Sequence, residues 1–73
     1  MSSVENMRVK VKRAEEARLI IERIIEQNPK MTQQEIAQRI GVSQPTLSLY
    51  LSERIAPSVE TLATLRAYAE AIV

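Results

Sequence analysis

The sequence predicts an all-α fold: a small domain of four helices, with five helices as the alternative, that contains a helix-turn-helix. Three observations support this prediction. Apolar residues recur at helical spacing through most of the chain, and the only glycine lies between two such segments. Aliphatic residues supply nearly all the apolar content, which is typical of a small helical bundle. A chain of 73 residues builds a core that is marginal by itself, so we expect oligomerisation.

Residues 1–11 form a basic segment ahead of the helix-turn-helix domain, which we place at residues 12–73. Met7, Val9 and Val11 alternate with basic residues, as in a strand. The same segment also fits one face of a helix. We favour a flexible arm or a short strand, because β-branched residues interleaved with charge are poor helix formers.

We expect the first helix over residues 12–27, ending before Asn28 and Pro29, because a residue that precedes proline avoids the α region. Its apolar stripe is too wide for one small core. Either Leu19 or Ile20 is an ordinary exposed apolar residue, or the stripe includes a surface that faces a partner.

The helix-turn-helix is expected over residues 33–52. Ala37 is the small residue required where two crossing helices approach closely. Gly41 is the residue that accepts a positive φ in the turn. Thr32 and Ser43 are placed to cap the two helices. The inward-facing apolar residues of this segment are Ile36, Ile40, Val42, Leu47 and Tyr50.

The connection from Ser52 to Pro57 reads as a loop, after which Ser58 is placed to cap a fourth helix. That helix carries apolar residues at helical spacing on one face. They are Val59, Leu62, Leu65, Ala69 and Ile72.

Three segments resemble the Cro/repressor-type family of bacterial and phage regulators. Residues 31–37 (MTQQEIA) are similar to the family's entry into its second helix, and residues 56–62 (APSVETL) to its loop into the fourth. Residues 42–48 (VSQPTLS) also resemble the recognition segment of lac-repressor-type regulators. The resemblance covers residues 31–72 and implies a lambda-repressor-like domain whose third helix enters the major groove of DNA.

The resemblance also implies which residues meet DNA. Gln44, Pro45, Ser48 and Leu49 would face bases. Gln44 is the strongest candidate, because a carboxamide can pair with both N6 and N7 of adenine. Leu49 departs from the polar residue or arginine often found at its position, so it would touch only a thymine methyl or a sugar. Phosphate contacts are expected from Gln33, Ser43, Thr46 and Arg54.

The distribution of charge adds two further candidates. The chain has a formal net charge of +1, which is a weak argument for nucleic acid. Residues 1–13 hold four basic residues against Glu5, a net +3, whereas residues 14–73 hold six basic and eight acidic residues, a net −2. We therefore expect Arg8 and Lys10 to contact phosphates as well.

Composition argues against an enzyme. The chain has no cysteine and no histidine, so it offers no disulfide, no thiolate or imidazole ligand for a metal, and no conventional nucleophile–base pair. We expect no metal and no cofactor. No apolar run approaches the roughly 20 residues of a membrane span, and no signal peptide is evident, so we expect a cytoplasmic protein.

These observations predict a transcriptional repressor or autoregulator that binds an inverted-repeat operator as a homodimer. The expected dimer surface lies on the first and fourth helices, and comprises Leu19, Ile20, Ile24, Tyr68, Ile72 and Val73. The main alternative is a protein-interaction module, since a helix-turn-helix does not oblige DNA binding. Its uncharged third helix, with Leu49, would then dock a toxin or another regulator. A fragment cut from a recombinase or a transposase is a further alternative.

Overall fold

The computed structural model describes the backbone of residues 3–71 and the side chains of residue 9 and of residues 11–71. Four helices follow one another in this part of the chain: α1 (Ser3–Gln27), α2 (Gln33–Ile40), α3 (Gln44–Leu51) and α4 (Val59–Ala71). The described residues contain no strand. The predicted all-α fold with four helices is therefore confirmed, and none of these helices is long and apolar enough to cross a bilayer.

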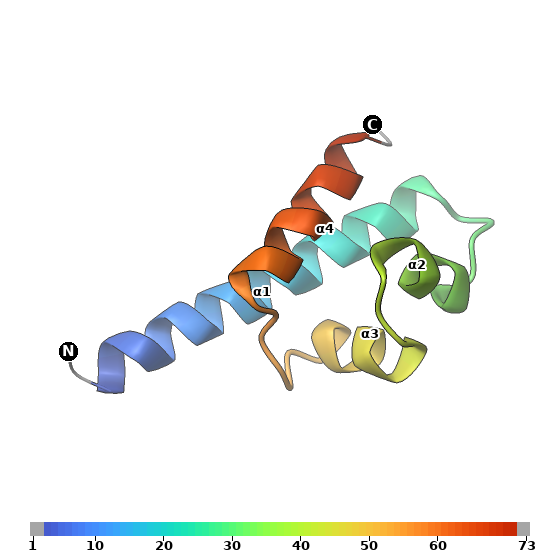
Figure 1. The fold of residues 1–73 in the computed structure, drawn as a ribbon. Helices are drawn as coiled ribbons and strands as arrows, with labels where there is room; N and C mark the ends of the chain where they lie inside the picture. Colours follow the sequence, from blue (N-terminus) through green and yellow to red (C-terminus); the bar gives the residue numbers. More distant parts are fainter. Residues whose placement is uncertain (1–2, 72–73) are drawn as a thin grey trace.

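The helix α1 is the longest element, and the other three gather around its C-terminal half (Figure 1). It packs most extensively against α4 and next against α3. All four helices contribute to one continuous core. Its members are Ala17, Ile21, Ile24, Ile36, Ala37, Ile40, Leu47, Tyr50, Leu62 and Leu65.

The start of α1 differs from the prediction. Residues 3–11 are helical and continuous with α1, so the expected arm or short strand, and a helix start near residue 12, are wrong. Extending an existing helix adds one hydrogen bond per residue without the cost of a new nucleus. The penalty of a β-branched residue, below about 0.7 kcal/mol relative to alanine, is too small to end the helix.

The predicted end of α1 at Gln27 is confirmed. The Nδ2 group of Asn28 donates a hydrogen bond to the Ile24 carbonyl at 2.9 Å, which satisfies one of the carbonyls left free at the helix terminus. Pro29 follows and, having no N–H, cannot continue the helix.

The turn between α2 and α3 depends on Gly41, as predicted. Its φ of 89° lies in the left-handed region. This conformation lets the Gly41 N–H bond the Gln38 carbonyl at 3.2 Å and the Val42 N–H bond the Ala37 carbonyl at 2.9 Å. The pattern is a Schellman motif, which ends α2 and turns the chain toward α3.

Three hydroxyl residues begin helices as the sequence predicts. Thr32 accepts from the Glu35 N–H at 3.2 Å, Ser43 from the Thr46 N–H at 3.3 Å and Ser58 from the Thr61 N–H at 3.2 Å. Each bond satisfies a donor that has no partner inside its helix. Start points of α2, α3 and α4 are therefore encoded locally.

Candidate nucleic-acid interface

The helix α3 has one buried side and one exposed side. Leu47 is fully buried and Tyr50 is 7% exposed, so these two residues anchor the helix in the core. Gln44, Pro45 and Ser48 are exposed. The eight residues of α3 include no charged side chain. The exposed side therefore presents a carboxamide, a hydroxyl and apolar surface. These groups can form hydrogen bonds and van der Waals contacts with a ligand, but they cannot attract it by charge.

Leu49 is half-buried and lies on the flank of this exposed side. Its carbonyl accepts from the Arg54 N–H at 3.0 Å and from the Ser52 hydroxyl at 3.1 Å. The backbone at Leu49 is thus tied to the turn that follows α3. Its side chain remains accessible enough for an apolar contact.

The N-terminus of α3 combines a cap with a second hydroxyl. Ser43 is exposed and Thr46 is half-buried. The Ser43 hydroxyl donates to Thr46 Oγ1 at 2.8 Å while it accepts from the Thr46 N–H. Both hydroxyls thus lie together at the N-terminus of α3.

The other residues predicted to contact phosphate lie at the ends of helices. Gln33 is the first residue of α2 and Arg54 follows α3 in the chain; both side chains are exposed. Arg8 and Lys10 belong to α1, and their side chains are outside the described part of the chain. The structure thus exposes Gln33 and Arg54 at the ends of the helix-turn-helix, while the predicted contacts of Arg8 and Lys10 stay predictions.

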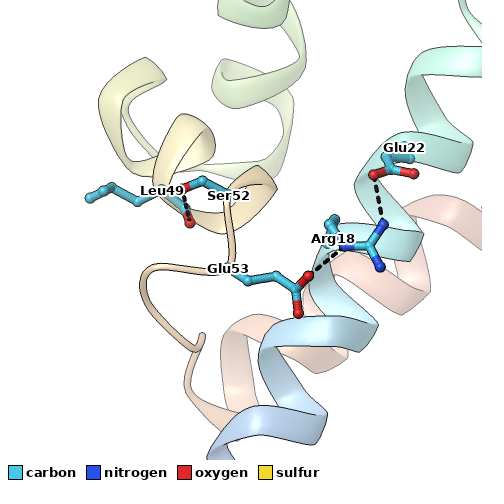
Figure 2. A network of polar contacts seen from close by, with 5 residues as sticks. All are labelled: Arg18, Glu22, Leu49, Ser52 and Glu53. Atoms are coloured by element: carbon cyan, nitrogen blue, oxygen red, sulfur yellow. Dashed lines mark hydrogen bonds and ion pairs between the residues drawn. The ribbon is translucent and has the colours of Figure 1, made fainter.

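An ion pair at the end of α3 was not foreseen from the sequence. Arg18 Nε donates to Glu53 Oε2 at 2.8 Å, and Arg18 Nη1 donates to Glu22 Oε1 at 2.9 Å (Figure 2). These hydrogen bonds to Glu22 and Glu53 raise the pKa of the Arg18 guanidinium. Glu53 lies 35 residues from Arg18 in the chain, so spacing gives no hint of the contact. The one available signal was an acidic residue at a position where helices usually end on glycine or asparagine.

A second ion pair joins α1 to α4. Arg66 Nε donates to Glu16 Oε2, and this hydrogen bond lowers the pKa of the Glu16 carboxyl and raises that of Arg66. Both side chains are substantially exposed, 53% for Arg66 and 39% for Glu16. The pair lies between α1 and α4, so it provides a control for the pair that touches the end of α3.

The structure corrects one part of the predicted dimer surface. Ile24 is fully buried in the core of the single chain and is unavailable to a partner. The sequence pattern could not distinguish it, because α1 has more apolar positions than one neighbour covers. Leu19 is 57% exposed, whereas Ile20 and Tyr68 are half-buried and pack against the core. Ile72 and Val73 lie outside the described residues.

Comparison with known proteins agrees with this geometry. A family model described as helix-turn-helix matches residues 21–70, which is more than half of the chain. Neither the curated proteins nor the solved structures that were compared contain a match to this sequence. The matching family consists of DNA-binding domains and is not catalytic. With α2, the Gly41 turn and the half-exposed α3 in place, the chain belongs to the Cro/repressor-type helix-turn-helix family of DNA-binding transcriptional regulators.

Proposed function

We propose that this protein is a transcriptional repressor or autoregulator that binds an inverted-repeat operator as a homodimer. One observation carries the proposal: α3 is anchored on one side by Leu47 and Tyr50 and exposes Gln44, Pro45 and Ser48 on the other. A helix held in this way can enter the major groove, which is about 12 Å wide. In this proposal the regulator is encoded by a bacterium or a phage and acts in the cytoplasm.

Base reading centres on Gln44 in this proposal. Its exposed carboxamide, at the first position of α3, both donates and accepts, as adenine N6 and N7 require. Ser48, one turn further along, adds a hydroxyl. Pro45 and Leu49 provide apolar contacts, which suit a thymine methyl.

Phosphate contacts fix the position of α3 but carry no base information. We assign them to Gln33 and Arg54 at the ends of the helix-turn-helix, and to Ser43 and Thr46 at the N-terminus of α3. The N-terminus of a helix attracts an anion, because free N–H groups point outward and the positive end of the helix dipole lies there. We assign further phosphate contacts to Arg8 and Lys10, because residues 1–13 carry the excess of basic charge.

Dimerisation doubles this limited set of contacts. Leu19 is the most exposed of the described residues in the predicted dimer surface. The proposed surface now comprises Leu19, Ile20, Tyr68, Ile72 and Val73. A two-fold dimer presents two copies of α3, so the operator should be an inverted repeat with half-site centres about 10–10.5 base pairs apart.

Selection of binding sites from random-sequence DNA, with the purified protein, tests this proposal directly. We expect a palindromic motif at the stated spacing and an affinity that falls steeply with salt, because phosphate contacts release counterions. A single asymmetric half-site would contradict the homodimer. Failure to select any sequence, together with capture of a protein partner insensitive to salt, would favour a protein-interaction module instead.

A further inference from the structure

The recognition helix α3 ends in an unusual way. The position after its C-cap, where helices usually have glycine, is occupied by Glu53 with a φ of 58°. This left-handed conformation is unfavourable for a residue that carries a Cβ. A carboxylate is also repelled by the carbonyl groups at the C-terminus of the helix, which is the negative end of the helix dipole. Glu53 is thus a poor choice for this position on two separate grounds.

The turn nevertheless closes α3 with regular hydrogen bonds. The Glu53 N–H donates to the Tyr50 carbonyl at 3.1 Å, and the Arg54 N–H donates to the Leu49 carbonyl at 3.0 Å. This is the same Schellman pattern that Gly41 forms at the end of α2. At the end of α3, however, the residue in the left-handed conformation is Glu53, and its carboxylate needs a partner of opposite charge.

Arg18 of α1 lies opposite that side chain, as Figure 2 shows. Its Nε donates to Glu53 at 2.8 Å, and the Glu22 carboxylate holds the guanidinium from the other side at 2.9 Å. The Arg18 and Glu53 side chains are only 31% and 34% exposed, so solvent screens this pair less than a fully exposed one.

Apolar packing and an open depression both lie where α1 meets this turn: Ala14 and Pro57 are buried, and Leu51 packs against the core. Between α1 and this turn lies an open depression of about 210 Å³, lined by Val11 and Ala14 of α1 and by residues 53–56. Val11 remains 54% exposed beside it. Among the described side chains, this ion pair is the hydrogen-bonded link between α1 and the turn that ends α3.

We infer that Arg18 is a positioning residue for DNA binding: its ion pair permits an acidic residue to end α3 in the left-handed conformation, and so fixes the last turn of the recognition helix together with Arg54. The inference rests on the proposed DNA-binding side of α3. Arg18 acts through Glu53 and does not itself touch DNA.

Amide hydrogen exchange tests the positioning without DNA. In Arg18→Gln, we expect the Glu53 and Arg54 amides to exchange about three- to tenfold faster, because the strained turn opens more often. Adding Glu53→Gly should return both amides to within about twofold of the wild-type rate, since glycine adopts this φ freely and removes the carboxylate. Arg66→Gln, which breaks the ion pair between α1 and α4, is the matched control and should leave these amides unchanged.

Affinity for the selected operator tests the consequence. Arg18→Gln should weaken operator binding about three- to tenfold, because the last turn of α3 is then less well ordered. The double variant Arg18→Gln/Glu53→Gly should restore the affinity. If Arg18 contacts a phosphate directly, the double variant stays weak and the salt slope falls by about one, which overturns the inference. Unchanged amide exchange in Arg18→Gln, or faster exchange with unchanged affinity, also overturns it. If the wild-type chain binds no DNA, the proposed function fails, while the exchange data still decide whether Arg18 holds the turn.

Discussion

Gln44 is the residue on which sequence-specific reading depends in our proposal. Replacing it with alanine should weaken binding to the selected operator about ten- to a hundredfold, since a bidentate contact to adenine is worth about 1–3 kcal/mol. Folding should be unaffected, because Gln44 is exposed and alanine is a good helix former. Fluorescence anisotropy with operator and scrambled DNA measures both affinities.

Gln33→Ala is the matched control for that measurement, since it removes the same carboxamide from the start of α2. It should weaken operator and scrambled DNA by similar factors, because a phosphate contact carries little base information. An equal loss on both DNAs for Gln44→Ala would show that α3 does not read bases through this residue.

Gly41 is required for its backbone conformation rather than for its small size. No atom beyond its immediate surroundings lies within 4 Å of the point where a Cβ would stand. Gly41→Ala should therefore lower the free energy of unfolding by about 1–2 kcal/mol, the cost of a left-handed φ for an L-residue. Gly41→Asn should cost less, because asparagine tolerates this conformation. Urea unfolding measures both values, and a loss well above this range would reveal a steric clash.

Among the elements, α1 and α4 are linked by an ion pair that predicts a pH dependence. Arg66 holds the pKa of the Glu16 carboxyl below its ordinary value of 4.5. A carboxyl whose pKa is lower in the folded state stabilises the fold above its unfolded pKa, and this stability is lost as the pH falls through the folded pKa. The stability that Glu16 contributes is thus fully present at neutral pH, begins to fall near the ordinary pKa and is lost as the pH falls through the lowered pKa.

The variant Glu16→Gln isolates this effect. It should be less stable than wild type at neutral pH, and the difference should shrink as the pH falls through the lowered pKa of Glu16, because a protonated carboxyl lacks the charge just as glutamine does. Thermal unfolding at a series of pH values measures the difference. A difference that stays constant across the whole range would mean that Glu16 acts through packing and not through its charge.

At the scale of the whole molecule, the dimer is the first prediction. Leu19→Glu places a charge on the most exposed of the described apolar residues in the proposed surface and should dissociate the dimer while the chain stays folded. Val59→Glu is the matched control, because Val59 is 67% exposed and lies outside that surface. Sedimentation at micromolar concentration distinguishes the two. A Leu19→Glu variant that remains dimeric would move the interface away from this part of α1.

The basic start of α1 gives the second prediction at this scale. Deleting residues 1–11 should leave the domain folded, because every described core residue lies at or beyond Ala14. Affinity for operator and random DNA should fall alike, and the salt slope should shrink by about one for each lost phosphate contact. The double variant Arg8→Ala/Lys10→Ala removes the charges alone and should reproduce most of the effect. Unchanged affinity in both would mean that this segment has no part in DNA binding.

Much of the fold follows from short stretches of sequence. Thr32, Ser43 and Ser58 begin three helices, and Gly41 ends one, as the sequence predicts. Each of these residues bonds or frees backbone groups within a few positions of itself, so its role can be predicted from the local sequence alone. The apolar spacing in α2 and α3 likewise identified Ile36, Leu47 and the other core residues there, because a short helix buries one narrow face.

One feature depended on the cooperativity of a whole helix, and two were decided only by the tertiary structure. The start of α1 at Ser3 reflects the cooperativity of a helix already formed downstream, which local propensity does not include. The burial of Ile24 and the exposure of Leu19 depend on where α4 and α3 pack along a stripe that is wider than either neighbour. The pairing of Arg18 with Glu53 joins residues far apart in the chain, and only folding brings them together. The sequence determined where α2, α3 and α4 begin and how α2 ends, and it is the basis for proposing α3 as the helix that faces DNA. Packing decided which side chains remain available to a partner and which residue pairs with Glu53 at the end of α3.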